Sequence, residues 1–508
     1  MDLASTVPPN APSEPRSRPL AGGVLMPGFA GTELPDWVAV RLRAGLASVC
    51  LYGPNITSAA QLRTLTAAIR SCNPDVLIAV DEEGGDVTRL HYDVGSPSPG
   101  NAWLGRLDDE ATTERVGAGI AAELRAVGCN LNLAPCADVN ANSDNPVIGV
   151  RSFGAAAELV ARHTAAWVRG HQAAGVAACV KHFPGHGDTS VDSHLSLPVV
   201  DLDADDLARR DLLPFARSIA ADAWSVMTSH ILLPRIDADE PATMSSRVLG
   251  SMLRDELGFE GVVVSDALDM AGASAAIGIP EAAVRALIAG CDLLCIGPDN
   301  TDEQIEEIGQ AIDDAVDSRR LPAARLASAV SRVAALSDRV APPAEHGDPV
   351  QAPPTFGLDE IARQFEVGAK VRAAISEVGA GSWTVVCLET TRNIAAGVAP
   401  WGPSAAVAAG DAAWSGDIRS VSEHTASSAI EVEAPGAFLV GQANHRHSWV
   451  RELVDRRRSV GPTVVVDMGW PSDDRRYADV ATFGASRLLG ASLLQTLEQL
   501  VREPGPAR

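Results

Sequence analysis

The segment from Lys181 to His194 concentrates side chains that could carry out acid/base or nucleophilic chemistry. It reads KHFPGHGDTSVDSH, in which three histidines, two aspartates and a lysine surround a proline and two glycines. The apolar stretch 176–180 directly before it predicts a buried strand, so Lys181 and His182 should lie at its carboxyl end and the rest should form a loop. In parallel α/β folds, that edge of the sheet carries the active site.

Asp266 is a second candidate, because it ends the apolar run GVVVSD at 261–266. A carboxylate there could be the nucleophile of a glycoside hydrolysis with retention, which also needs a nearby proton donor. We predict that His194 is this donor and that Asp192, on the same loop, orients and stabilises its imidazolium. Structural roles compete with these: Asp266 could cap a following helix, and Asp192 could bond local amides in a turn.

The same loop suggests a metal site formed by His182, His186 and Asp188. This reading is disfavoured, because Pro184 and the glycines preclude the helix that usually arranges such ligands, and Lys181 would repel a cation. The CxxxC pair Cys291 and Cys295 has no second pair to complete a zinc site, so we interpret the scattered cysteines as core residues without disulfides. The expected reaction needs neither a metal nor a cofactor.

Short apolar runs that end in polar residues or glycine recur along the first two thirds of the chain, each separated from the next by enough sequence for a helix. They lie at 22–26, 47–52, 76–80, 130–135, 177–181, 225–230, 261–266 and 292–297. Segments between them, such as 109–127 and 157–174, have helical periodicity. This pattern predicts an α/β fold, a (β/α)8 TIM-type barrel over 1–340, with a doubly wound open sheet as the alternative.

The barrel interpretation predicts that polar residues at the strand ends meet at one mouth. The residues that close an apolar run in this way are Asp81, Asp138, Lys181, His230 and Asp266.

The proline-rich stretch 341–356 follows the helical segment 302–338 and predicts a linker. Beyond it, 357–508 should form a smaller α/β/α domain, with buried strands at 383–388, 437–440 and 463–468. That domain shows no comparable cluster of chemical side chains.

Composition narrows the function further. A chain of 508 residues with 46% hydrophobic content can fill two cores. The net charge of −24 argues against nucleic acid or an anionic membrane surface as partner and favours a small or neutral ligand. Neither a signal peptide nor a membrane-spanning run is evident, so we expect a cytoplasmic protein, a monomer or a homodimer.

Three of these segments together resemble glycoside hydrolase family 3, specifically its bacterial β-N-acetylglucosaminidases: the run from Lys181 to His194, MTSH at 227–230, and LGFEGVVVSDAL at 257–268. The resemblance extends to DEEGGDVTR at 81–89 and NPVIGVRSFG at 145–154, so it covers roughly 20–340. It implies a retaining enzyme that removes terminal non-reducing β-linked N-acetylglucosamine from a small carbohydrate such as chitobiose or a cell-wall fragment.

The resemblance also assigns roles to single residues. Asp266 would be the nucleophile, and Asp192 with His194 would be the acid/base dyad. The implied substrate-binding residues are Asp81, Arg89, Arg151, Lys181, His182, Met227 and His230. Two other functions stay open: a phosphorylase with phosphate as acceptor, and a non-catalytic sugar-binding protein.

This chain departs from the family pattern at Glu82 and Asp86, where relatives often carry Gln and Arg. These residues predict extra negative charge near the pocket. Because the acid/base dyad lies on the barrel loop, the second domain is not expected to be needed to complete the site.

Overall fold

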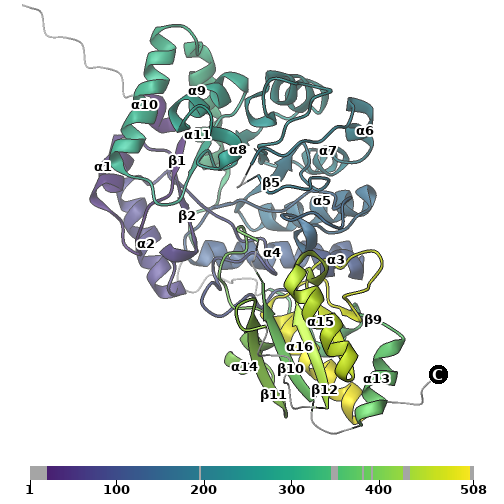
Figure 1. The fold of residues 1–508 in the computed structure, drawn as a ribbon. Helices are drawn as coiled ribbons and strands as arrows, with labels where there is room; N and C mark the ends of the chain where they lie inside the picture. Colours follow the sequence, from purple (N-terminus) through teal and green to yellow (C-terminus); the bar gives the residue numbers. More distant parts are fainter. Residues whose placement is uncertain are drawn as a thin grey trace, which may run out of the picture.

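The computed structural model describes residues 20–193, 196–344, 353–379, 383–390, 393–426 and 435–503 of the chain. Residues 20–340 form a curled sheet with helices around it (Figure 1). The strands of this part are β1 (Leu25–Pro27), β2 (Ser48–Leu51), β3 (Leu77–Val80), β4 (Leu131–Asn132), β5 (Ala177–Phe183), β6 (Ser225–Thr228), β7 (Val262–Val264) and β8 (Leu294–Gly297).

Neighbouring strands are parallel and follow one another in sequence order. β2 to β7 form one sheet and β1 pairs with β8 in another. A parallel bridge between Val264 and Leu293 continues β7 toward β8, and the amide of Ala47 donates to the carbonyl of Gly22 at the remaining seam. The barrel fold class is therefore confirmed. A doubly wound sheet is excluded, because its strand order would reverse at a switch point.

The helices alternate with the strands as the periodicity predicts. They are α1 (Asp36–Ala44), α2 (Ala59–Cys72), α3 (Asn101–Leu107), α4 (Glu110–Ala126), α5 (Ala157–Ala173), α6 (Ala204–Arg209), α7 (Leu213–Ala220), α8 (Ala271–Ser274), α9 (Ile279–Ala289), α10 (Asp302–Asp317) and α11 (Ala323–Arg339), with 3₁₀ turns η1 (Leu20–Val24), η2 (Gly53–Asn55), η3 (Gly149–Arg151) and η4 (Ala242–Met244) and the π-helical η5 (Arg247–Glu256). The expected single helical segment 302–338 is two helices: α10 ends at Asp317, Arg319 has a positive φ of 61°, and α11 begins directly after Pro322.

The C-terminal part contains a six-stranded sheet in the order β11-β10-β12-β13-β14-β9, parallel except for β9. Its strands are β9 (Glu366–Val367), β10 (Trp383–Glu389), β11 (Asp417–Ser422), β12 (Gly436–Gly441), β13 (Thr463–Asp467) and β14 (Val480–Ala481), and its helices are α12 (Leu358–Ala362), α13 (Lys370–Val378), α14 (Gly402–Ala408), α15 (Ser448–Val460) and α16 (Arg487–Arg502), with the turn η6 (Asn444–Arg446).

Two hydrophobic clusters show that this sheet is the middle of three layers. Val386, Leu439 and Val465 pack on one face with residues of α15, whereas Val385 and Val464 share a cluster with residues of α13 and α16 on the other. The three strands expected here correspond to β10, β12 and β13. The short β9, β11 and β14 were not anticipated, because two of them have two residues each and β11 is mostly polar.

The second domain docks beside α3 of the barrel (Figure 1). Trp103 of α3 is fully buried, with its ring 5.2 Å from that of Phe356, and its indole N–H donates to the carbonyl of Ile361 at 3.1 Å. Arg106 forms an ion pair with Glu366 at 2.9 Å. Of the stretch expected to be a linker, residues 345–352 lie outside the described residues.

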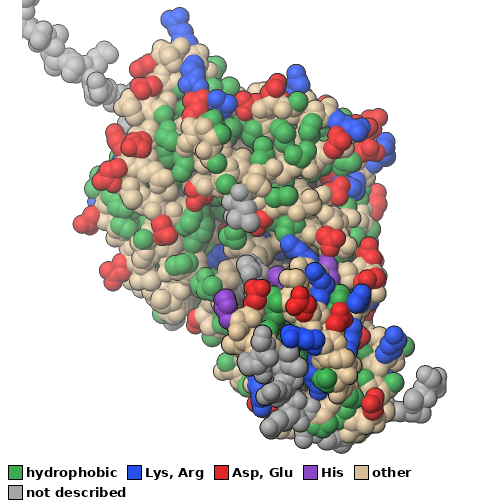
Figure 2. Space-filling model, viewed as in Figure 1, with side chains coloured by type: hydrophobic (Ala, Val, Ile, Leu, Met, Phe, Trp, Pro, Cys, Tyr) green, Lys and Arg blue, Asp and Glu red, His purple; other side chains and the backbone are tan. Residues whose placement is uncertain are grey.

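On the face shown in Figure 2, histidine and basic side chains gather where the two domains meet. Among the helices of the described ranges, none is both long and apolar enough to cross a membrane.

Candidate active site

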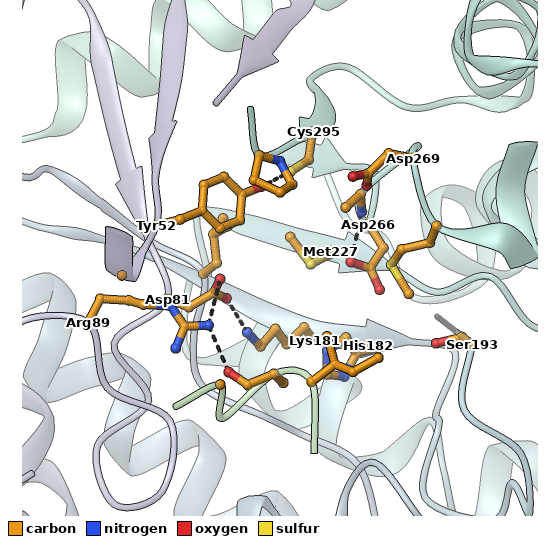
Figure 3. Close-up of a pocket in the computed structure, with 18 of the residues that line it drawn as sticks. Tyr52, Asp81, Arg89, Lys181, His182, Ser193, Met227, Asp266, Asp269 and Cys295 are labelled. Carbon is orange, nitrogen blue, oxygen red and sulfur yellow. Dashed lines mark hydrogen bonds and ion pairs between the residues drawn. The ribbon is translucent and has the colours of Figure 1, made fainter. Parts of the chain in front are cut away.

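A cavity of about 470 Å³ opens at the carboxyl ends of the barrel strands (Figure 3). Asp81 follows β3, Lys181 and His182 belong to β5, Met227 belongs to β6, and Asp266 follows β7. All five line the cavity, together with Arg89 and Arg151 from the intervening loops. The second domain contributes Ile394, Ala395 and Gly397 to the same wall.

Four charged residues form a linked group on one side of the cavity, here called the mouth cluster: Asp81, Glu83, Arg151 and Lys181. The Lys181 ammonium lies 2.7 Å from Asp81 and 2.8 Å from Glu83. The Arg151 guanidinium donates to both oxygens of Glu83, at 3.0 and 2.7 Å. Although burial opposes it, these two cations hold the pKa of Glu83 well below its usual range.

The carboxylates in turn keep the cations charged. Burial by itself would lower the pKa of Lys181, but Asp81 and Glu83 raise it above its ordinary value. Glu83, Arg151 and Lys181 therefore stay ionised across the physiological pH range. Charged donors and acceptors at a cavity wall are well suited to sugar hydroxyls, since a hydrogen bond to a charged group contributes about 1.5–3 kcal/mol.

Arg89 connects the barrel to the second domain. One of its guanidinium nitrogens lies 3.8 Å from Asp81 and donates to the backbone carbonyl of Ala395 at 2.8 Å. The second domain thus touches a cavity-lining residue directly. This differs from the expectation that the barrel would form the site without it.

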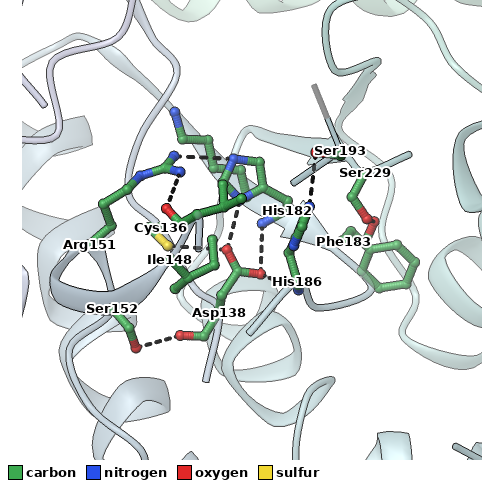
Figure 4. Close-up of polar contacts among 12 residues, drawn as sticks. Cys136, Asp138, Ile148, Arg151, Ser152, His182, Phe183, His186, Ser193 and Ser229 are labelled. Atoms are coloured by element: carbon green, nitrogen blue, oxygen red, sulfur yellow. Dashed lines mark hydrogen bonds and ion pairs between the residues drawn. The ribbon is translucent and has the colours of Figure 1, made fainter. Parts of the chain in front are cut away.

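His182 is held from below by Asp138 (Figure 4). The Nδ1 of His182 lies 2.7 Å from a carboxylate oxygen of Asp138, and its Nε2 lies 3.3 Å from the Arg151 guanidinium. Because the carboxylate can only accept, Nδ1–H donates to it and Nε2 is left to accept from Arg151. Asp138 is fully buried, and although burial opposes it, His182 and His186 hold the pKa of Asp138 well below its usual range.

Sequence reasoning placed Asp138 at the mouth but did not assign it a role, and it did not single out Glu83 from the DEEGG run. Both carboxylates act on residues that line the cavity. One sequence feature could have pointed to both carboxylates: each follows shortly after the end of an apolar run, at the edge of the sheet where polar side chains can face a cavity.

Asp266 lies across the cavity from the mouth cluster (Figure 3). One of its oxygens accepts from the amide of Ala267 at 2.8 Å. Among the described helices none begins at Asp266, because α8 starts at Ala271 and its N-cap residue is Met270. Asp266 is therefore not a helix cap. The fully buried His230 supports this turn from behind: its Nε2 lies 3.0 Å from the carbonyl of Ala267.

Of the two predicted acid/base residues, Asp192 belongs to the described part of the chain, and it lies beside the cavity. Ser193 lines it and is 3.0 Å from His186, whereas Asp192 lines a neighbouring cavity of about 270 Å³ between the barrel and the second domain. Val147 and Arg151 line both cavities, so the two adjoin. His194 lies outside the described residues.

Comparison with known proteins identifies the family. The protein-family model described as "Glycosyl hydrolase family 3 N terminal domain" matches residues 33–336. The chain belongs to glycosyl hydrolase family 3. A β-hexosaminidase A from Pseudoalteromonas piscicida is 36% identical over a 337-residue alignment that covers 61% of this chain and 56% of that relative. A β-hexosaminidase from Stenotrophomonas maltophilia is 38% identical over 336 residues, 64% of this chain and 96% of that relative.

A solved structure extends the likeness to both domains. The family 3 β-N-acetylglucosaminidase from Paenibacillus sp. str. FPU-7 superposes with a TM-score of 0.83 at 29% identity, covering 96% of this chain and 98% of that one. This family 3 chain is therefore a glycoside hydrolase.

The two departures from the family pattern, Glu82 and Asp86, are not among the residues that line the larger cavity of this glycoside hydrolase. The carboxylate of Glu82 is buried and accepts from the Thr88 hydroxyl and from the amides of Arg89 and Leu90, at 2.7–3.0 Å. Asp86 accepts from the amide of Ala485 in the second domain at 2.7 Å and lines the smaller cavity. Glu82 thus orders the loop that carries Arg89, and Asp86 fastens the two domains.

The residues proposed as metal ligands are spread over separate contacts: Asp188 forms an ion pair with Arg210 at 2.9 Å, and His186 bonds Thr189 and Ser193. Within the described ranges, Cys136, Asp138 and His182 do lie close enough to share an ion. Their polar atoms are paired with one another: a carboxylate oxygen of Asp138 accepts from the Cys136 thiol at 3.1 Å and from Nδ1–H of His182 at 2.7 Å.

Proposed function

We propose that this chain is a retaining β-N-acetylglucosaminidase that removes terminal β-linked N-acetylglucosamine from the non-reducing end of a small saccharide. The observation that carries the proposal is the shared cavity, in which the Asp266 carboxylate lies across from the mouth cluster. The activities named for its relatives in family 3 support the choice of sugar.

The mouth cluster, Arg89 and His182 would hold the hydroxyls of the terminal sugar. Its cavity, at about 470 Å³, falls in the range of about 300–1,000 Å³ that is usual for small-molecule sites. Because these side chains are buried and already paired with one another, they are held in place before the sugar arrives, and little side-chain entropy is lost on binding.

Asp266 would attack the anomeric carbon, forming a covalent glycosyl-enzyme while the bond to the leaving oxygen breaks. His194, supported by Asp192, would give its proton to that oxygen. Water would then attack the anomeric carbon, give a proton back to His194 and release Asp266, so that the sugar leaves with its original configuration.

The test is release of nitrophenol from the 4-nitrophenyl β-glycosides of N-acetylglucosamine, glucose and xylose, with Asp266→Ala as control. We expect turnover of the N-acetylglucosaminide alone and, by proton NMR, the β-anomer as first product. Equal rates on the three glycosides, or the α-anomer first, would contradict the proposal. Formation of sugar 1-phosphate when phosphate is added would instead identify the phosphorylase.

The proton donor can be tested with leaving groups of different acidity. Removing the donor in His194→Ala should depress turnover of chitobiose, whose leaving group needs protonation, far more than turnover of the nitrophenyl glycoside. Equal losses on both substrates would exclude His194 as the acid.

A further inference from the structure

The loop that follows β10 in the second domain reaches the barrel mouth and lines the sugar cavity with Ile394, Ala395 and Gly397. Its first described residue, Asn393, makes two side-chain hydrogen bonds that point in opposite directions. The Nδ2 of Asn393 donates to the carbonyl of Val147 in the barrel, and its Oδ1 accepts from the amide of Ala395 at 2.8 Å. A carbonyl requires a donor and an amide N–H requires an acceptor, so both ends of the carboxamide are matched.

Each of these contacts leads to one of the two arginines that line the cavity. The carbonyl of Ala395, whose own amide is bound to Asn393, accepts from Arg89 at 2.8 Å. The carbonyl of Val147, which receives the Asn393 amide, also accepts from Arg151 at 3.1 Å. A single residue therefore connects Asn393 to each guanidinium group by hydrogen bonds: Ala395 to Arg89, and Val147 to Arg151. Val147 is 246 positions away from Asn393 in the sequence.

We infer that Asn393 is a positioning residue through which the second domain sets the affinity of the barrel for its terminal sugar. This inference rests on the proposed function for the identity of the sugar. Asn393 holds the Ala395 carbonyl where it fixes one arginine, and it holds the Val147 carbonyl where it fixes the other. Both arginines line the cavity, so a shift of either carbonyl would move a guanidinium group that is proposed to contact the sugar.

The location of the loop decides which step should be affected. It contacts Arg89, on the side of the mouth cluster and away from Asp266, so it acts on the sugar being held and not on the leaving group. Contacts made equally in the bound state and in the transition state change KM and leave kcat nearly unchanged. The effect should also be the same for every substrate that ends in the same sugar.

Comparison with a relative indicates that the Asn393 contacts are specific to chains with both domains. The Stenotrophomonas maltophilia β-hexosaminidase aligns 96% of its length with 64% of this chain, which leaves little of it to form a counterpart of the second domain. In that relative, the arginine-holding contacts would have to come from elsewhere.

The experiment compares Asn393→Ala and Asn393→Asp with the full-length wild-type protein. The Ala variant loses both hydrogen bonds, whereas the nearly isosteric Asp variant keeps the acceptor for Ala395 and places an oxygen against the Val147 carbonyl. We expect Asn393→Ala to raise KM about fivefold to tenfold, less than for the complete loss of a charge-assisted hydrogen bond, because the arginines stay in the cavity wall and are only displaced. The same factor should appear for the nitrophenyl glycoside and for chitobiose, with kcat nearly unchanged.

Calorimetric binding of free N-acetylglucosamine gives a readout that does not depend on turnover, and its Kd should rise by the same factor. A rise in KM in the Asp variant as well would assign the effect to the barrel side of the contact. Arg106→Ala is the matched control, because it removes another contact between the domains, the ion pair with Glu366, and touches no residue of the cavity. It should lower the melting temperature and leave KM unchanged.

Unchanged KM and Kd in Asn393→Ala would overturn the inference. So would an equal rise in KM in Arg106→Ala, since the effect would then be general loosening of the domain interface. A failure of the proposed function would be seen separately, as a wild-type protein that does not release nitrophenol from the N-acetylglucosaminide.

Discussion

The two ends of the barrel each contain a buried group of opposite charges, but they face different surroundings. At the mouth, Lys181 and Arg151 surround Glu83 beside an open cavity. At the opposite end, Asp292 precedes β8 and accepts from Arg254 at 2.6 Å, from Arg325 at 2.9 Å and from the amide of Val263 at 3.0 Å. We call this second group, which Arg332 approaches to 3.6 Å, the base cluster.

Burial alone does not separate a functional site from a structural one, since Glu83 and Asp292 are both almost fully buried. The two clusters differ in whether their charged side chains border a cavity that a ligand could enter. In the base cluster both carboxylate oxygens of Asp292 are occupied by protein donors that fasten β7, β8 and α11 to one another. In the mouth cluster the cations are held by carboxylates and still line a cavity. Ion pairs at the mouth therefore hold charged side chains at the wall of a cavity, and those at the base join elements of the fold.

The largest expected effect is at the mouth. Asp266→Ala should reduce turnover of the nitrophenyl N-acetylglucosaminide by roughly a thousandfold or more, because a covalent nucleophile is lost. The melting temperature should stay near that of the wild type, since the carboxylate lies at a cavity wall. Steady-state kinetics and thermal unfolding measure the two. Activity that survives in this variant would mean that another residue attacks the sugar.

Glu83→Gln should impair both activity and stability. The amide leaves Arg151 and Lys181 short of one buried negative charge, a change that costs about 3–5 kcal/mol when a buried pair is broken. The same loss releases the two cations proposed to hold the sugar, so kcat/KM should fall about tenfold or more. A variant with normal kcat/KM would remove Glu83 from the binding machinery.

Asp292→Asn is the matched change at the base. It should cost a similar amount, about 3–5 kcal/mol of unfolding free energy, because Arg254 and Arg325 lose their buried counter-charge. In contrast to Glu83→Gln, the folded fraction should keep its KM and kcat. Denaturant unfolding and kinetics on the same preparation test this. A raised KM in this variant would contradict the interpretation that the base cluster affects only stability.

The smallest expected effect is the loss of folding stability when the pH is lowered, to which the buried His186 contributes. Burial, with a smaller contribution from His182, lowers the pKa of His186 to about 4, against about 6.5 in an unfolded chain. The unfolded chain therefore takes up the proton first, so stability is complete above pH 6.5 and is lost as the pH falls toward 4. Between pH 7 and pH 5 this amounts to about 2 kcal/mol.

The measurement is thermal unfolding of the wild type and of His186→Gln at both pH values. The wild type should lose more stability than the variant on acidification, and the other buried histidines cancel because both proteins contain them. Equal losses would show that the acid sensitivity arises away from the mouth.

The sequence predicted the barrel well because its strands lie in mostly apolar runs that are fully buried, such as Leu77–Val80 and Val262–Val264. The same property placed Asp81, Lys181 and Asp266 at one edge, where the structure brings them to one cavity. Glu83 and Asp138 were harder to interpret, since a buried carboxylate acquires its role from the cations that surround it. Asn393 could not be found at all: its partner Val147 is remote in sequence and is used through its backbone carbonyl, which leaves no mark in the sequence.

Trp103 adds a consequence for the barrel without its second domain. Its indole is covered by Phe356 and bonded to Ile361, both of which lie beyond the barrel. A chain shortened after the barrel would lose the Phe356 ring contact and leave the Trp103 N–H without its carbonyl acceptor, and apolar surface around α3 would become exposed to water. The isolated barrel should therefore be more prone to aggregate than the two-domain protein.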